Sequence, residues 1–90
     1  MIRGMSKSKR SRVEIYADVL RALRTVDGGC RITRLSYGTN MPLDRMNDLV
    51  EELISFGLVS KRPDDPRFYV ITARGIDFLD AFKKLFLFLE

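Results

Sequence analysis

The fold is decided by residues 31–71, which read RITRLSYGTNMPLDRMNDLVEELISFGLVSKRPDDPRFYVI. The stretch begins with a short apolar helix, expected over about Arg31 to Tyr37, and a Gly-Thr-Asn turn at 38–40. A second helix follows, ends at Gly57, and leads into two short β-prone runs around a loop that carries Pro and Asp. Gly and Asn suit a tight connection between crossed helices because they tolerate positive φ. The order of helix, turn, helix and hairpin predicts a winged helix-turn-helix unit.

The second helix of this unit has the clearest hydrophobic pattern in the chain. Pro42 suits its first turn because the missing N–H would have no helical partner there. Gly57 is expected in the left-handed conformation that often ends a helix. The apolar residues recur at spacings of three and four, which places them on one helical face: Leu43, Met46, Leu49, Val50, Leu53 and Ile54.

Two further helices are expected, one on each side of the unit. Ser11 and Glu14 form a capping box, so a first helix should begin near Arg12 and stop at the Asp-Gly-Gly sequence of residues 27–29. Thr72 can cap a last helix from Ala73 to Glu90. We therefore expect a mainly α protein with a small β-hairpin from Leu58–Ser60 and Phe68–Ile71. Its segments are a flexible basic arm (1–10), a winged helix-turn-helix domain (11–72) and a C-terminal dimerisation helix (73–90).

Composition narrows the class of function. Ninety residues make one small domain, and 16 Lys and Arg against 12 Asp and Glu give a net charge of +4, which favours a polyanionic partner. With no histidine and one cysteine, neither a structural zinc site nor His-based catalysis is expected, so we assign no catalytic residue, metal or cofactor. Cys30 is either a redox sensor or, as we favour, a small partly buried residue. No signal peptide or membrane span is evident, which predicts a cytoplasmic protein.

Positive charge and hydrogen-bonding side chains mark the candidate DNA contacts. Arg45 and Asn47 lie opposite the apolar face of the second helix, where Arg can read guanine and Asn can read adenine; the alternative is that both are ordinary solvated residues. The wing and arm cations are either phosphate contacts or solvated charges. The full candidate set is Lys7, Lys9, Arg10, Arg31, Arg34, Asn40, Arg45, Asn47, Lys61, Arg62 and Arg67.

Four acidic residues complicate this interpretation. Asp44, Asp48, Glu51 and Glu52 outnumber Arg45 and give the second helix a net charge of −3, which DNA phosphates repel. Arm and wing would then supply most of the affinity for duplex DNA. The alternative is a protein-interaction module that uses the acidic helix. The two hypotheses differ in whether Asp44 and Asp48 share the exposed face with Arg45 or pair with basic residues of the preceding helix.

The C-terminal segment is unusually apolar. Residues 85–89 read LFLFL, and a helix with no polar side needs more than a small domain to cover it. The prediction is a homodimer interface, with a helix folded back on its own domain as the alternative. The candidate interface residues are Ile76, Leu79, Phe82, Leu85, Phe86 and Leu89.

Three stretches carry a resemblance to a known family: RSRVEIY (10–16), EELISFGLV (51–59) and YVITARGIDFL (69–79). In this order they resemble archaeal winged-helix proteins, most of all the 10a-type chromosomal DNA-binding proteins and related predicted transcriptional regulators. The resemblance covers about residues 7–85. It implies double-stranded DNA as partner, a nucleoid-associated location, and an antiparallel coiled coil of two chains through residues 76–89. The chain departs from the family at Pro42, where Ser is usual, and at Asp44 and Asp48, where basic residues are usual.

Overall fold

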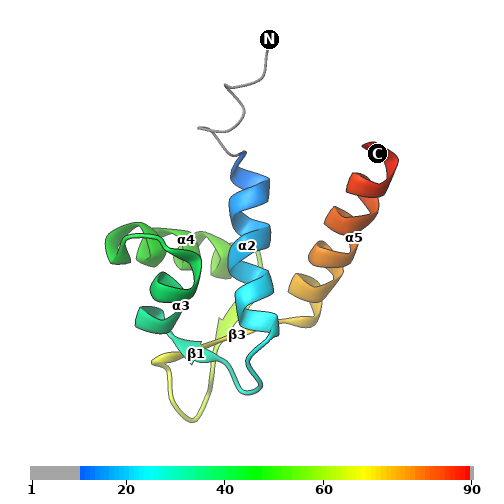
Figure 1. The fold of residues 1–90 in the computed structure, drawn as a ribbon. Helices are drawn as coiled ribbons and strands as arrows, with labels where there is room; N and C mark the ends of the chain where they lie inside the picture. Colours follow the sequence, from blue (N-terminus) through cyan, green and yellow to red (C-terminus); the bar gives the residue numbers. More distant parts are fainter. Residues whose placement is uncertain (1–10, 90) are drawn as a thin grey trace.

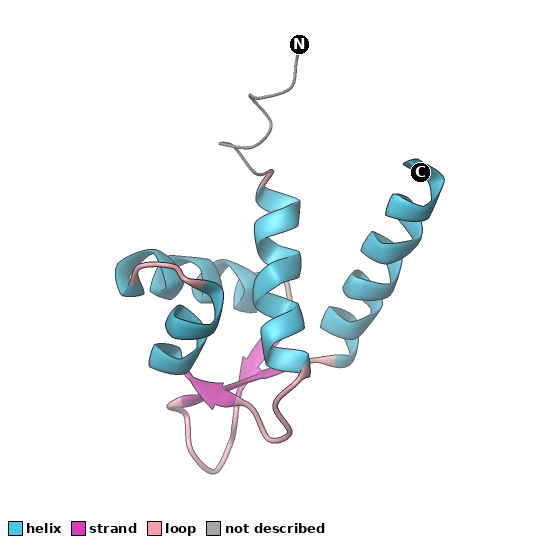
Figure 2. Cartoon of the chain, in the orientation of Figure 1, coloured by secondary structure: helices cyan, strands magenta, loops and turns pink. Residues whose placement is uncertain are grey.

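The computed structural model describes residues 11–89, except for the side chains of Phe86 and Leu89. Within this part of the chain, four helices lie on one side of a three-stranded sheet (Figures 1 and 2). The predicted winged helix-turn-helix fold is confirmed. In chain order the elements are α2 (Arg12–Arg24), β1 (Cys30–Arg31), α3 (Ile32–Thr39), α4 (Leu43–Ser55), β2 (Val59–Lys61), β3 (Phe68–Ile71) and α5 (Ala73–Leu89).

Helix α2 starts at the predicted capping box. The Glu14 N–H donates to Ser11 Oγ at 3.1 Å, and the Ser11 N–H donates to Glu14 Oε1 at 2.9 Å. Both bonds satisfy N–H groups that have no partner inside the helix. The helix lies between α3 and α5 (Figure 1), and its buried face supplies a third of the core.

We expect Ser11→Ala to lower the free energy of unfolding by about 1 kcal/mol, because the Glu14 N–H loses its acceptor. Urea unfolding followed by circular dichroism measures the change. Ser11→Asn is the matched control, since Asn caps a helix as well as Ser does. Equal stability of the alanine and asparagine variants would contradict a capping role.

The core is built from all four helices and two strands. Four of the six apolar residues predicted to face the core from α4 are buried, whereas Leu43 is exposed and Ile54 is only half-buried. The buried side chains are those of Tyr16, Ala17, Val19, Leu20, Leu23, Cys30, Leu35, Met46, Leu49, Val50, Leu53, Leu58, Val59, Leu79 and Phe82.

Strand β1 was not predicted. The sheet order is β1-β3-β2, with both pairs antiparallel, so β1 adds a strand to the expected hairpin. Arg31 therefore belongs to a strand paired with Phe68, and the prediction that α3 starts at Arg31 was wrong by one residue. Gly28 and Gly29 have φ of +80° and +83°, a conformation that turns the chain from α2 into this strand. The predicted strand at Leu58–Ser60 lies one residue later, at Val59–Lys61.

The helix-turn-helix connection is tighter than predicted. Gly38 and Thr39 still belong to α3, and only Asn40 takes the left-handed conformation, with φ 57° and ψ 42°. Its N–H donates back to the carbonyls of the last turn of α3. Pro42 stands immediately before Leu43 and caps α4 without a side-chain bond. Asn serves here because its short polar side chain tolerates a left-handed backbone.

The end of α4 is bonded to the start of α5. Gly57 takes the predicted left-handed conformation, with φ +77°, and the Leu58 N–H donates to Leu53 O at 2.9 Å. Thr72 caps α5 as predicted, since its Oγ1 accepts from the Gly75 N–H at 3.0 Å. The same hydroxyl donates to Gly57 O at 2.7 Å, and Arg74 Nε donates to Phe56 O at 2.9 Å. These bonds hold the base of α5 against the C-terminus of α4.

Candidate nucleic-acid interface

The exposed face of α4 carries both signs of charge. Arg45 and Asn47 are exposed, as predicted, and so are Asp44 and Asp48. Within residues 11–89, neither aspartate forms an ion pair, and neither does Arg45. The carboxylates therefore share the exposed face with Arg45 and are not neutralised by α3.

Glu52 is the acidic residue of α4 that turns away from this face. Its carboxylate accepts a hydrogen bond from the Tyr16 hydroxyl of α2 and lies 3.6 Å from Arg12 Nη2. The bond to a carboxylate raises the pKa of Tyr16 above its ordinary value. Glu52 thus joins α4 to α2, which removes one of the four negative charges from the surface that DNA could approach.

Each arginine of the wing is held by a nearby aspartate. Arg62 Nε and Nη2 donate to the two carboxylate oxygens of Asp64 at 2.9 and 2.6 Å, and Arg67 donates to Asp65 in the same two-bond manner at 3.0 and 3.1 Å. These pairings hold the pKa values of both carboxyls below, and of both guanidinium groups above, their ordinary values. The predicted wing cations are present, but two of them carry their own counter-charge.

Arg62 also connects the wing to the rest of the domain. Its Nη1 donates to Gly28 O at 3.3 Å, and its guanidinium lies 5.2 Å from the centre of the Phe68 ring. Cation–π contacts of this kind orient a guanidinium without neutralising it. The side chain is therefore positioned by three contacts at the base of the hairpin.

Strand β1 brings Arg31 to the same place. Arg31 pairs with Phe68 on one edge of β3, while Lys61 pairs with Tyr69 on the other edge. Arg31 is close enough to Asp65 to help lower the pKa of that carboxyl, after the larger effect of Arg67. We refer to Arg31, Lys61, Arg62 and Arg67 as the wing cluster. Its four cations come from β1, β2 and the loop between β2 and β3.

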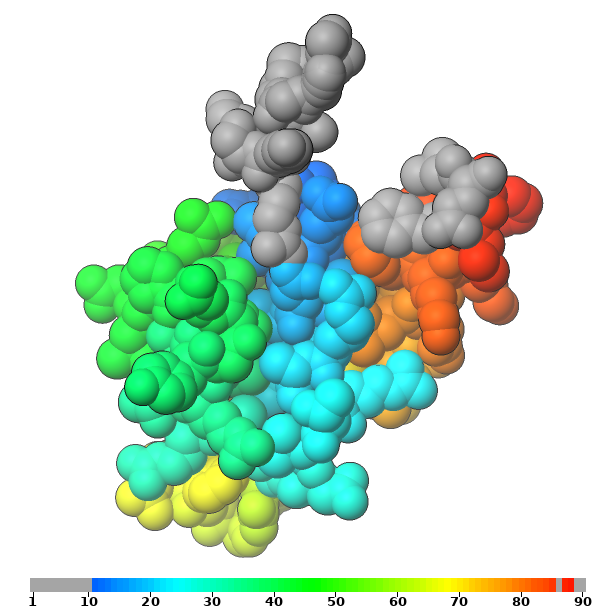
Figure 3. Space-filling view, in the orientation of Figure 1, coloured from blue at the N-terminus to red at the C-terminus, as the bar shows by residue number. Residues whose placement is uncertain are grey.

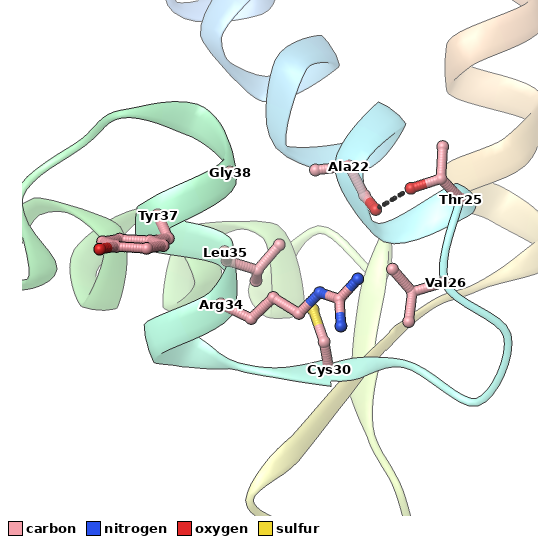
Figure 4. Close-up of a pocket in the computed structure, with 8 residues that line it drawn as sticks. All are labelled: Ala22, Thr25, Val26, Cys30, Arg34, Leu35, Tyr37 and Gly38. Atoms are coloured by element: carbon pink, nitrogen blue, oxygen red, sulfur yellow. Dashed lines mark hydrogen bonds between the residues drawn. The ribbon is translucent and has the colours of Figure 1, made fainter.

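Arg34 lies apart from the wing cluster. Its side chain extends across a surface hollow of about 390 Å³ between α2 and α3, toward Cys30 and Val26 (Figure 4). Cys30 is buried at the floor of this hollow, and burial raises the pKa of its thiol despite the nearby Arg34 charge. A thiol with a raised pKa is a poor nucleophile at neutral pH, which favours the structural interpretation of Cys30.

Two residues at the end of α3 face solvent. Asn40 is exposed in the turn, as a predicted contact should be. Tyr37 is 92% exposed and received no role from the sequence. It lies on the side of α3 that faces away from α2 (Figure 4). Its spacing of four residues from Thr33 was the available signal, because this spacing shares one helical face.

The comparison with known families agrees with this geometry. A model of the winged helix-turn-helix family matches residues 9–90. This chain belongs to the winged helix-turn-helix family. None of the curated proteins matches the sequence significantly.

Solved structures confirm the winged helix-turn-helix fold. A mutant of S. aureus MepR superposes with a TM-score of 0.69 at 16% sequence identity, over 94% of this chain and 64% of the MepR chain. CouR from Rhodococcus jostii RHA1, bound to p-coumaroyl-CoA, superposes with a TM-score of 0.64 at 23% identity, over 89% of this chain and 57% of the CouR chain. The winged-helix chain thus spans about three-fifths of each of these two proteins.

Five predicted site residues fall wholly or partly outside the described part of the chain. Lys7, Lys9 and Arg10 lie outside the described residues, as do the side chains of Phe86 and Leu89. No helix in the described part of the chain combines the length and hydropathy needed to cross a membrane.

Helix α5 divides into a covered half and an uncovered tip. Leu79 and Phe82 are 6% and 8% exposed because they pack on α2 within one chain, and Ile76 is half-buried. Arg24 of α2 lies 3.5 Å from Asp80, which adds an ion pair to this contact. The tip is different: its exposed side chains are Leu85 (55%), Leu87 (67%) and Phe88 (87%). Figure 3 shows α5 on the opposite side of α2 from α3 and the wing.

Proposed function

We propose that this winged-helix protein binds double-stranded DNA as a dimer and acts as a transcriptional regulator or chromatin-associated factor. The observation that carries the proposal is the wing cluster beside a helix-turn-helix whose second helix exposes Arg45 and Asn47. In this fold the second helix enters the major groove, and flanking elements contact the DNA backbone.

The mechanism follows from where the charges lie. Four cations of the wing cluster attract phosphates without reading sequence, and Lys7, Lys9 and Arg10 of the N-terminal segment would add to them. Helix α4 contributes base contacts from Arg45 and Asn47, weakened by the exposed carboxylates of Asp44 and Asp48. Binding is therefore mainly electrostatic, with modest sequence preference.

The proposed dimer joins the tips of two α5 helices. Burying Leu85, Leu87 and Phe88 against a partner contributes about 1.5 to 3 kcal/mol for each side chain before the cost of association. The tip adjoins a groove between α2 and α5, of about 610 Å³, which is lined by apolar, polar and charged side chains: Leu79, Phe82 and Leu87 with Arg21, Arg24, Thr25, Asp80 and Lys83. Within the family we place the chain with the archaeal 10a-type chromosomal proteins, and with them in the cytoplasm at the nucleoid.

A salt titration of binding to a random-sequence duplex of about 30 base pairs tests the proposal. Light scattering on the same sample gives the oligomeric state. We expect micromolar affinity that falls steeply with salt, since each neutralised phosphate releases counterions, and a mass of two chains. A monomer in light scattering would reject the dimer.

A second candidate function rests on the exposed carboxylates. Asp44 and Asp48 lie unpaired on the helix that should meet DNA, and a protein surface with basic residues would accept them. A winged helix is a fold and not a function, and the same scaffold can carry a protein-interaction surface. Absence of DNA binding at low salt would favour this second function.

A further inference from the structure

One face of α3 consists of exposed, uncharged side chains that can donate hydrogen bonds. Thr33 and Tyr37 are four residues apart in α3 and share one helical face, and Asn40, the exposed residue that caps the helix, lines one hollow with Tyr37. Tyr37 is the most prominent, with 92% of its surface exposed. Within residues 11–89 its phenol makes no hydrogen bond and no ring contact. The fold itself therefore gives no reason for a tyrosine at this position.

Tyr37 borders the entrance to α4. One shallow hollow is lined by Tyr37 together with the residues of the turn, namely Ser36, Asn40, Met41 and Pro42. A second hollow is lined by Tyr37 together with Thr33 and Arg34. The ring thus projects between two depressions, beside the N-terminus of the helix that exposes Arg45 and Asn47.

The geometry of helix-turn-helix binding places the first helix, here α3, beside the DNA backbone. When the N-terminal half of the second helix lies in the major groove, the first helix crosses the sugar-phosphate backbone at the edge of that groove. Tyr, Thr and Asn side chains are among the common donors to phosphate oxygens. Arg34 borders one hollow with Thr33 and Tyr37, but its guanidinium extends away from them, over the hollow between α2 and α3 toward Cys30 (Figure 4).

We propose that the Tyr37 hydroxyl, flanked by Thr33 and Asn40, donates a hydrogen bond to the sugar-phosphate backbone of bound DNA. The inference rests on the proposed DNA-binding function and assigns a further contact to it. The salt dependence of this contact differs from that of the contacts made by the wing cluster. A neutral donor adds affinity without releasing a counterion, whereas each Lys or Arg contact adds to the salt dependence.

The experiment is a salt titration of duplex binding with wild type, Tyr37→Phe and Tyr37→Ala. We expect both variants to bind about tenfold more weakly at every salt concentration, with the slope of log K against log salt unchanged, because a hydrogen bond to a charged acceptor is lost and no charge is removed. Their melting temperatures should equal that of wild type, since an exposed side chain without contacts contributes little to folding.

Gly38→Ala is the matched control on the next residue. A Cβ at Gly38 would have no atom within 4 Å, and the residue is helical, so alanine should raise the melting temperature and leave binding unchanged. This variant shows whether a small change in the stability of α3 alters affinity by itself.

Three outcomes would overturn the inference. Wild-type affinity in either tyrosine variant would show that Tyr37 does not contact DNA. Unchanged DNA affinity with loss of the dimer in light scattering would assign this face to a contact between copies of the chain. If the wild-type protein itself fails to bind DNA at low salt, both the proposed function and this inference are wrong. The titration of the wild-type protein alone distinguishes this outcome from the first two.

Discussion

Replacing Arg62 and Arg67 together with alanine is expected to weaken binding to every duplex sequence by about 10- to 100-fold at low salt, and to reduce the salt slope by about two units. Each arginine in contact with a phosphate contributes about 0.9 to that slope. Salt titrations of the wild type and the double variant over the same range measure both the affinity and the slope. A slope equal to that of wild type would contradict the phosphate-binding role of the wing.

Replacing the two aspartates of the wing is expected to have the opposite effect on DNA binding. Arg62 and Arg67 each engage a carboxylate through two hydrogen bonds, so binding a phosphate exchanges one anionic partner for another. Asp64→Asn with Asp65→Asn removes the competing charge, and we expect tighter binding with a steeper salt slope. Weaker binding in this double variant would mean that the carboxylates hold the arginines in a productive orientation.

Local chemistry explains why much of the fold was predictable. The capping box at Ser11 and Glu14 and the left-handed Gly57 depend on neighbours within a few residues, and both occur as predicted. The stripe on α4 was predictable for the same reason, because helical spacing alone determines which side chains share a face. Met46, Leu49, Val50 and Leu53 are all buried.

Strand β1 shows where local reasoning stops. A strand of two residues, Cys30 and Arg31, is too short to show a periodic pattern. Its partners are Tyr69 and Phe68, nearly forty positions later in the chain. Only the turn at Gly28 and Gly29 hinted that the chain changes direction there. The position of Arg31 beside the wing, and thus the full wing cluster, depended on this pairing.

The apolar residues of α5 show a second limit. Spacing identifies an apolar helical face but does not say what covers it. Leu79 and Phe82 were assigned to a partner chain, yet α2 of the same chain buries them, while Leu85 stays exposed. The interface prediction therefore rests on the tip of the helix, where Leu87 and Phe88 add exposed surface that the predicted set did not include.

Gly29→Ala is expected to destabilise the domain by about 3 kcal/mol or more, a large share of the roughly 5 to 10 kcal/mol that folds a domain of this size. A Cβ on Gly29 would lie 2.2 Å from Tyr69 O and 2.5 Å from Val70 Cγ1, and backbone atoms of β3 cannot move away cheaply. The residue also has φ of +83°, which strains any side chain. Urea unfolding followed by circular dichroism measures the loss.

Gly28→Ala separates the steric clash with β3 from the strain of the left-handed backbone. Gly28 has nearly the same φ, +80°, but the nearest atom to its added Cβ is Arg62 Nη1 at 3.6 Å, an ordinary contact. This variant should lose only the cost of the left-handed backbone, about 1 kcal/mol. The difference between the two variants then measures how closely the turn before β1 packs against β3. If both lost the same amount, β1 would not lie against β3 as described, and Arg31 would not be held beside the wing.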